Sequence, residues 1–303
     1  MREAFGYTLQ ELAGSMDNLV VVAADTSESI SSGLFGRKYP ERFFNVGIAE
    51  QNMIGISAGF ALYGKTAFCG TYAVFLERAM DQIRNTVAYC NLDVKIIGAH
   101  TGLSVGPDGG SHQAIEDIAF MRALPNFRVL APADAYSAKQ LIAQAAKIKG
   151  PFYIRLIRSS FPNVYTDQSL EVGKASVLMD GDDITIIACG VMVQTAMRAA
   201  KRLGKLAISA RVIDLHTIKP LDHDTILKAA KDTGKVITVE DHNVMGGMGS
   251  AVAEFLSSKR PTHIEMIGVN DTFGESGKDV EVLAKYGLTE ENIMEKAKLM
   301  TRF

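Results

Sequence analysis

Cysteine is scarce in this sequence. Only Cys69, Cys90 and Cys189 occur among 303 residues. An odd number of widely spaced cysteines in apolar surroundings argues against a disulfide framework and against a zinc site, and it favours reduced thiols in a cytoplasmic protein. We therefore interpret all three side chains as small buried apolar groups.

An excess of charge of either sign is also missing. Lysine and arginine total 32 residues and aspartate and glutamate 34, so the formal net charge is −2 and the pI is near 6.3. Without a basic surface field, we expect neither nucleic acid nor an anionic membrane as a main partner. Any phosphate group must then be bound by local arginines.

Long apolar runs are absent too. No stretch approaches the roughly 20 apolar residues that span a bilayer. The first residues, MREAFGYTLQEL, are amphipathic and contain acidic residues, unlike an export signal. We predict a cytoplasmic protein without a membrane segment. Short repeats and low-complexity tracts are also missing, which argues against a solenoid or a disordered tail.

Two kinds of apolar segment alternate along the first half of the chain. Strands are expected at residues 19–24, 43–46, 66–69, 94–99, 129–131 and 152–157, and helices at 2–16, 49–62, 76–89, 113–123 and 135–146. Strands that alternate with helices and lack hairpin signals predict a parallel sheet covered on both faces. A domain of this kind has an ordinary size.

The second half repeats this alternation on a smaller scale. Strands are expected at 184–189, 210–215, 236–240 and 263–267, and helices at 192–203, 223–233, 250–257 and 290–299. Around residues 159–171 the periodicity is lost while Pro, Asn, Asp and Ser gather, which is typical of a linker. We predict an α/β fold of two doubly wound domains, residues 1–162 and 173–303, joined by a linker at 163–172.

The stretch NVGIAEQNMIGISAG, residues 45–59, places an acid where α/β folds bind ligands. Glu50 follows the strand at 43–46 and lies in the first turn of the next helix, at the strand-to-helix crevice. The nearby Ile48, Ala49, Met53 and Ile54 are apolar, so a charge is poorly solvated there. A carboxyl group that shares a proton suits contact with a ring nitrogen. The simpler alternative is a glutamate that complements the helix dipole.

Two further loops of the first domain follow strands at the same edge of the sheet. The first begins with Asp25 and continues with hydroxyl-rich residues that include Ser29. The second holds Tyr72 and Phe75, aromatic side chains that can stack on a flat heteroaromatic ring. Loops at this edge commonly carry function. The alternatives are a helix cap for the first loop and core packing for the aromatic residues.

A third loop, AHTGLSVGPDGGSHQAIED, is rich in glycine and places His100, Asp108 and His112 at the same edge. Glycine and proline bring the backbone close to whatever binds there. A histidine and an aspartate separated by small residues can hydrogen-bond hydroxyl groups and pass protons near neutral pH. A turn at Asp108 and a helix cap at His112 remain the ordinary alternatives.

Six segments, in the same order, resemble the pyrimidine-binding and carboxy-terminal domains of transketolase. They are FNVGIAEQNM, GTYAVFLERAMDQIRN, VGPDGGSHQAIED, LPNFRVLAPAD, DLHTIKPLD and VEDHNVMGGMGSAVAE. The similarity covers nearly the whole chain and goes beyond an analogy of fold. It implies that thiamine diphosphate is the cofactor, bound by the first domain through its pyrimidine ring, and that the activity is transfer of a two-carbon ketol unit between sugar phosphates.

The resemblance also implies roles for individual residues. Glu50 matches the catalytic acid that hydrogen-bonds the aminopyrimidine ring of the cofactor. Phe75 matches the aromatic residue that stacks on this ring, and Tyr72 lines the same pocket. Asp25 matches a residue near the cofactor across a subunit boundary.

Substrate contacts are implied in the same way. Asp108 matches an aspartate that reads a sugar hydroxyl, and His112 a catalytic histidine that contacts substrate oxygens. The loop here reads DGGSHQ, with Gly and Ser in place of the family's Pro and Thr. Arg158 matches a phosphate-binding arginine, whose planar fork suits a phosphate dianion. Further phosphate contacts are implied for Arg2, His100 and Ser29.

Nothing in the sequence resembles the GDG motif and downstream Asn by which the amino-terminal domain of transketolase holds the diphosphate. The resemblance therefore implies the carboxy-terminal subunit of a split transketolase. A partner, the amino-terminal transketolase subunit, would carry the diphosphate-binding domain and a Mg or Ca ion. This chain would also self-associate as a dimer within a heterotetramer.

Three alternatives remain open. Two are the beta subunit of a 2-oxo-acid dehydrogenase and a half that is similar to deoxyxylulose-phosphate synthase. The third is an assembly subunit without catalytic activity. The pairing of Asp108 with His112, beside Arg158, favours a phosphorylated polyol as the substrate.

Overall fold

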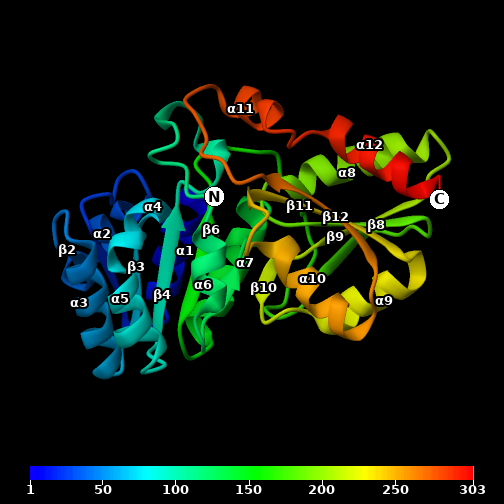
Figure 1. Cartoon of the computed structure of the whole chain (residues 1–303). Coiled ribbons are helices and arrows are strands. Elements are labelled where there is room, and N and C mark those ends of the chain that lie inside the picture. Colours follow the sequence, from blue (N-terminus) through cyan, green and yellow to red (C-terminus); the bar gives the residue numbers. More distant parts are fainter. Residues whose placement is uncertain (303) are drawn as a thin grey trace.

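The computed structural model describes residues 1–302 and shows two α/β units side by side, each built on its own sheet (Figure 1). The first sheet has seven strands in the order β10-β5-β6-β4-β3-β1-β2, and the second has five in the order β12-β11-β8-β9-β7. Every pair of neighbouring strands is parallel except β10–β5 and β7–β9. The predicted fold class, two doubly wound α/β domains, is confirmed.

The first sheet contains β1 (Leu19–Ala23), β2 (Phe43–Asn45), β3 (Thr66–Tyr72), β4 (Val94–Ala99), β5 (Arg128–Leu130), β6 (Phe152–Leu156) and β10 (Thr217–Lys219). The helical elements of this unit are α1 (Arg2–Ala13), α2 (Gly33–Lys38), η1 (Pro40–Arg42), α3 (Glu50–Leu62), α4 (Ala73–Leu76), η2 (Glu77–Ala79), α5 (Met80–Gln82), the π-helix η3 (Ile83–Ala88), η4 (Leu103–Asp108), α6 (Asp117–Ala123) and α7 (Ala135–Lys147).

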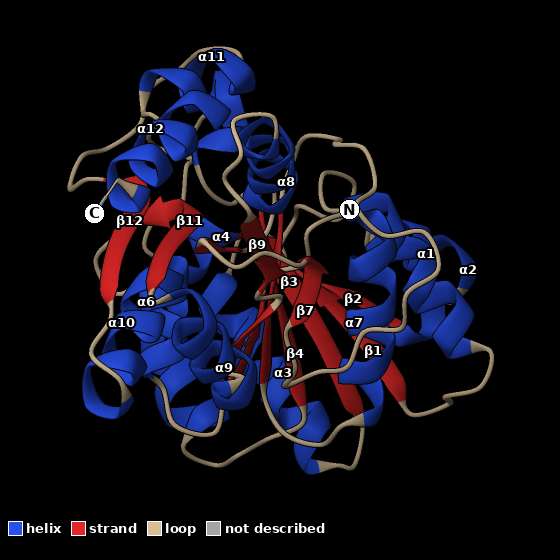
Figure 2. Cartoon of the chain, turned by 90° about the vertical axis from the view of Figure 1, so that its right-hand side faces the viewer, coloured by secondary structure: helices blue, strands red, loops and turns tan. Residues whose placement is uncertain are grey.

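The second sheet contains β7 (Ser176–Met179), β8 (Ile184–Ala188), β9 (Ala210–Asp214), β11 (Lys235–Asn243) and β12 (His263–Val269). Its helices are α8 (Met192–Gly204), α9 (His223–Thr233), α10 (Met248–Lys259), α11 (Asp279–Lys285) and α12 (Glu290–Thr301). Figures 1 and 2 show α8 and α12 on one face of this sheet and α9 and α10 on the other. No helix within residues 1–302 is long and apolar enough to cross a membrane.

Strand β1, second from the edge of the first sheet, shows why these segments form a covered parallel sheet. All five of its residues are buried. Leu19 and Val21 belong to the apolar cluster that includes Phe5 of α1, whereas Val20 and Val22 belong to the cluster that includes Met53 of α3. A strand that is buried on both faces must be apolar at every position, and this is the pattern that the sequence carries.

Two short strands depart from the prediction of purely parallel sheets. β10 comes from the second half of the chain but pairs antiparallel with β5 at the edge of the first sheet. Lys219, at the end of β10, donates from Nζ to the carbonyl oxygens of Arg122 (2.9 Å) and Leu124 (2.5 Å), at the carboxyl end of α6. β7 pairs antiparallel with β9 at the edge of the second sheet. Strands of three or four residues carry too little periodicity to be predicted.

Several predicted boundaries also change. β3 extends beyond Cys69 because it pairs with β4 as far as Tyr72. The continuous helix predicted at 76–89 is divided into η2, α5 and η3. The helix predicted at 113–123 begins only at Asp117, since the carbonyl oxygens of Ala114 and Ile115 accept hydrogen bonds from backbone N–H groups of other segments.

The predicted burial of all three cysteines is wrong for Cys90. Its side chain is exposed, whereas Cys69 and Cys189 are buried. Cys90 lies just after η3, where the chain turns toward β4. The two buried thiols lie in β3 and directly after β8, among apolar side chains.

The segment between the units contains no helix or strand, but it is anchored to both of them. Tyr165 is fully buried. The backbone N–H groups of Val164 and Tyr165 donate to Oδ2 of Asp134, which caps α7, and the Tyr165 hydroxyl donates to Asp214 of β9. The limits of the two domains within this segment remain a prediction.

Candidate active site

The predicted site residues gather at the carboxyl edge of the first sheet. β1 lies between β2 and β3, so the chain winds away from β1 in two directions. In open α/β sheets the resulting crevice is the usual ligand site. The loops that follow β1, β3 and β4 open at this edge, and the segment that follows β6 carries Arg158 to it.

Glu50 is the first residue of α3 and is almost fully buried. Its Oε2 lies 3.4 Å from Nη1 of Arg78, whose own side chain is exposed. The expected apolar surroundings are only partly present, because Met53 and Ile54 are buried whereas Ile48 is 73% exposed. The geometry gives a buried carboxyl group beneath an exposed arginine, and its place in the first turn of α3 also complements the helix dipole.

Four rings form one cluster beside this helix. Tyr72 stacks on Phe75, with ring centroids 5.1 Å apart, and on His100, at 3.7 Å. His112 presents its edge to Phe75 and Tyr72, at 5.5 Å and 6.0 Å. The sequence predicted a loop for the two aromatic residues, but Tyr72 lies at the end of β3 and Phe75 lies in α4. Both side chains are only half-buried. Because Tyr72 already stacks on two rings, Phe75 is the better placed of the two to stack on a bound ring.

His100 is held neutral within this cluster. Its side chain is buried, and Nδ1 has no hydrogen-bond partner among the described residues. Burial, followed by the positive charges of Arg2 and Arg158, lowers the pKa of His100 to about 3. A neutral imidazole with an unpartnered buried nitrogen is ready to bind a polar ligand group.

Arg2 and Arg158 line a common cavity of about 230 Å³. Nη1 of Arg158 lies 2.6 Å from Oδ1 of Asp108 and donates to the carbonyl oxygen of Val105 at 3.3 Å. The pKa of Arg2 is lowered by burial and by the charge of Arg158. The lining also includes Glu3 and Glu28. An anion placed between the two guanidinium groups would relieve their mutual repulsion.

Ser29 and Asp25 contribute less directly than expected. Ser29 accepts a hydrogen bond from Arg2 Nη1 (2.5 Å) through its backbone carbonyl oxygen, not through its hydroxyl group. Asp25 is exposed, and its backbone N–H donates to Oδ1 of Asn45. Ser29 therefore orients Arg2, while Asp25 lies at the surface beside β2.

Sequence reasoning missed three residues near the site. Arg78 pairs with Glu50. Glu77 carries a pKa raised to about 8 by burial and by the nearby Glu116 and Asp117. Asp241, in β11, accepts hydrogen bonds from the glycine-rich loop. For Asp241, the signal available in the sequence was the run Glu240, Asp241 and His242 within a predicted strand, because buried charges need specific partners.

Metal ligands do not cluster at this edge of the sheet. Within residues 1–302, no group of three or more His, Cys, Asp or Glu side chains is arranged to hold a metal ion. The chemistry available here is thus a buried carboxyl group, stacked rings, a neutral imidazole and two arginines in a polar cavity.

Family comparison divides the chain into two parts. Residues 1–163 match the family described as transketolase, pyrimidine binding domain, and residues 173–293 match transketolase, C-terminal domain. A protein of Methanocaldococcus jannaschii named putative transketolase C-terminal section is 47% identical, over 97% of this chain and 93% of its own length. One subunit of the apulose-4-phosphate transketolase of Phocaeicola vulgatus is 39% identical, over 98% of this chain and 96% of its own length.

Two further matches bear on the assembly and on the reaction. A solved structure described as a split gene transketolase, inactive beta4 tetramer, superimposes with a TM-score of 0.91, 45% identity and coverage of 99% of this chain and 97% of that chain. The 1-deoxy-D-xylulose-5-phosphate synthase of Desulforudis audaxviator is 38% identical over 97% of this chain, which spans 47% of that enzyme.

Proposed function

This chain belongs to the transketolase family, and on that basis we propose that it is the carboxy-terminal subunit of a split transketolase. In this role it transfers a two-carbon ketol unit between sugar phosphates, together with a partner chain. The observation that carries the proposal is the gathering, at one sheet edge, of a buried acid, a stack of aromatic rings and a two-arginine cavity.

Thiamine diphosphate fits the residues at this edge. The half-buried Phe75 ring, with Tyr72 stacked on it, suits the flat pyrimidine ring, and the buried Glu50 carboxyl group suits a hydrogen bond to a ring nitrogen. When bound, thiamine diphosphate supplies the carbon nucleophile that takes up the ketol unit. Glu50 would hold the proton at the pyrimidine, Phe75 and Tyr72 would orient the ring, and the partner chain would hold the diphosphate and its Mg or Ca ion.

The sugar phosphate would bind along the glycine-rich loop. Arg158 and Arg2 would receive the terminal phosphate, with Ser29 supporting Arg2. Asp108, His112 and His100 would contact sugar hydroxyl and carbonyl oxygens. The phosphate would compete with Asp108 for Arg158, since the two side chains already pair at 2.6 Å. A relative is named for a transketolase of apulose 4-phosphate, which supports a phosphorylated substrate.

The surface around α3 supports association with other chains. This helix is apolar on several sides. Its last residue, Leu62, and the flanking Ile48 and Tyr63 are large apolar residues that are exposed. Gly55 and Gly59 also face open space. Exposed apolar surface of this kind is typical of interfaces. It would serve self-association as a dimer and contact with the amino-terminal subunit, and would bring Asp25 near a cofactor that is shared between subunits.

Reconstitution tests the proposal. This chain and a separately purified amino-terminal transketolase subunit are assayed alone and mixed, with thiamine diphosphate and Mg, for transfer from a ketose phosphate to an aldose phosphate. Only the mixture should be active. Full activity of this chain by itself, at rigorous purity, would contradict the split-subunit proposal.

A second candidate function is supported by the similarity to a deoxyxylulose-phosphate synthase. That reaction would join pyruvate to an aldose phosphate and release carbon dioxide. Incubating the same mixture with pyruvate as the only donor separates the two functions. A transketolase should release no carbon dioxide under these conditions.

A further inference from the structure

The glycine-rich loop of the first unit is held by the second unit. We define residues 102–112 as the substrate loop. Asp241, in β11 of the second unit, accepts the backbone N–H of Leu103 at Oδ1 (2.8 Å) and that of Ser104 at Oδ2 (3.2 Å). The contact is close, because a Cβ atom at Gly102 would lie 2.3 Å from Asp241 Oδ2. Both oxygens of one carboxylate are thus engaged by consecutive amides of the loop.

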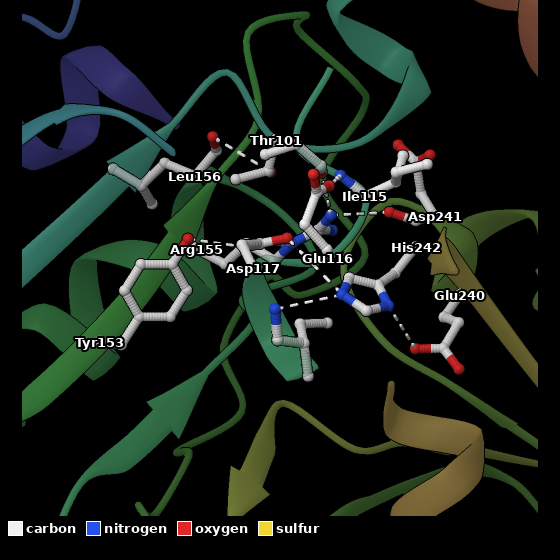
Figure 3. Close-up of polar contacts among 12 residues, drawn as sticks. Thr101, Ile115, Glu116, Asp117, Tyr153, Arg155, Leu156, Glu240, Asp241 and His242 are labelled. Carbon is white, nitrogen blue, oxygen red and sulfur yellow. Dashed lines mark hydrogen bonds and ion pairs between the residues drawn. The ribbon is translucent and has the colours of Figure 1, made fainter. Parts of the chain in front are cut away.

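Asp241 is itself fixed in place. Figure 3 shows its surroundings at the junction of the two units. Arg155 of β6 donates from Nη2 to the backbone carbonyl oxygen of Asp241 at 2.7 Å and from Nε to Oδ2 of Asp117 at 3.0 Å. All three side chains are nearly fully buried. The hydrogen bond from Arg155 holds the backbone of Asp241, and the positive charge of Arg155 partly compensates the two buried carboxylates.

The substrate loop also touches the second unit along the rest of its length. Gln113, just after the loop, donates from Nε2 to the carbonyl oxygens of Leu103 (3.2 Å) and Glu275 (3.1 Å). A Cβ atom at Gly109 would lie 2.4 Å from Ser276 Oγ, and one at Gly106 would lie 3.2 Å from the Gly277 carbonyl oxygen. Glycine lets the loop backbone lie directly against residues 275–277.

Ser104, which Asp241 holds, and the next residue, Val105, contact the segment that carries Arg158. The carbonyl oxygen of Ser104 accepts from Ser159 Oγ at 3.2 Å, and that of Val105 accepts from Arg158. The short helical segment η4 reaches Asp108 only after a kink at Gly106, where φ is 72° and ψ is −110°. A shift of the backbone at Leu103 and Ser104 would move the carbonyl oxygen of Val105 that Arg158 contacts, and Arg158 in turn pairs with Asp108.

We propose that Asp241 is a positioning residue, through which the carboxy-terminal unit sets the affinity for substrate without touching it. Asn at this position keeps the size and one acceptor oxygen but turns an NH₂ group toward one of the two amides. The loop then loses a charge-assisted hydrogen bond and gains a repulsive contact. The consequence for substrate rests on the proposed function, whereas the hold on the loop does not.

Amide hydrogen exchange of this chain tests the hold directly. In the unsubstituted protein, the amides of Leu103 and Ser104 should be protected. In Asp241→Asn their exchange should be faster by about tenfold, the effect of losing roughly one such bond. The matched control is Asp214→Asn, which alters another buried aspartate of the second unit, bonded to Tyr165 rather than to the loop. It should leave the loop amides unchanged.

Amide exchange in the unsubstituted protein is by itself sufficient to overturn the proposal. Fast exchange at Leu103 and Ser104, at the rate of exposed loops, would do so whether or not Asp241→Asn folds. Unchanged exchange in a folded Asp241→Asn protein would have the same consequence.

Kinetics of the assembled enzyme test the effect on substrate. Asp241→Asn should raise KM for a ketose phosphate by about tenfold, with kcat within about twofold. Cofactor affinity should not change, because no hydrogen bond or ion pair links Asp241 to Glu50 or Phe75 within residues 1–302. Parallel losses of cofactor affinity, kcat and melting temperature would indicate a merely structural residue and overturn the proposal. An inactive wild-type complex would instead refute the proposed function and leave the exchange result standing.

Discussion

Replacing Arg158 by Ala separates phosphate recognition from every other role of the site. If Arg158 forms a charge-assisted pair with the substrate phosphate, the pair contributes about 2 kcal/mol. This free energy corresponds to a rise in KM of about thirtyfold for a phosphorylated acceptor. The contact is made alike in the ground state and the transition state, so kcat should change little.

The cost to stability should be small. Arg158 is about one-third exposed, and its pair with Asp108 joins two partly exposed side chains. Pairs of this kind contribute about 1 kcal/mol or less. The lost hydrogen bond to the carbonyl oxygen of Val105, at 3.3 Å, is also a weak one. The variant should therefore fold and assemble, and its KM can be interpreted as a binding effect.

The assay compares two acceptors in the assembled enzyme, an aldose phosphate and the unphosphorylated glycolaldehyde. Only the phosphorylated acceptor should show the rise in KM. The matched control is Arg211→Ala, since Arg211 pairs with Asp232 at the same 2.6 Å but lies in β9 of the second unit. Arg211→Ala should leave KM unchanged for both acceptors.

An equal rise in KM for both acceptors would refute the role of Arg158 in phosphate recognition. Arg158 would then support the fold or the cofactor, and the proposed sugar-phosphate specificity would lose its main local support. A useful second variant is Asp108→Ala, which frees Arg158 of its partner. It should weaken the binding of acceptors that carry the sugar hydroxyl group contacted by Asp108, but the enzyme should still prefer phosphorylated to unphosphorylated acceptors.

Three further outcomes are expected. Glu50→Gln should retain the fold but lower kcat by at least about tenfold, since one charged hydrogen bond is worth about 1.5 to 3 kcal/mol; an unchanged rate would leave Glu50 only its helix-start role. Phe75→Leu should weaken cofactor binding about fivefold through the lost ring stacking, measured by titration of the assembled complex, and unaltered affinity would contradict the stacking role. Burial raises the pKa of Asp214 to about 8, so the folded state holds a proton that the unfolded state loses near pH 4. Asp214 therefore lowers the free energy of unfolding increasingly as pH rises from about 4 to 8. In urea unfolding, Asp214→Asn should be more stable than the wild type at pH 8, with a smaller difference at pH 5. A difference in stability that is independent of pH would show that Asp214 is ionised in the folded state.

Much of the fold could be predicted because most of its strands are buried on both faces. The segments at β4 and α9 were predicted to the residue, at 94–99 and 223–233. Their apolar spacing is strong, and α9 has an aspartate cap and a glycine end. By contrast, α2, α11 and the edge strands β7 and β10 were not predicted. Each is short, and β10 forms only because β5 offers a free edge.

The candidate site followed the same division. The sequence predicted which residues lie at the carboxyl edge of the first sheet, because strand ends, glycine-rich turns and family motifs are local features. Their assignment to cofactor and substrate, like the limits of the two domains, remains a prediction. The structure added where the side chains meet, including the stacking of Tyr72 on His100 and the ion pair of Arg158 with Asp108.

By itself, the sequence determined the alternation of strands and helices, the family resemblance and the chemical types of side chain at the sheet edge. These properties depend on residues that are near one another along the chain. Only the tertiary structure decided that Arg78 covers Glu50 and that Asp241 holds a loop about 140 residues earlier in the chain. Hydrogen bonds and ion pairs act over a few ångströms in space. Arg78 and Glu50 become neighbours only when the first unit folds, and Asp241 meets its loop only when the two units pack together.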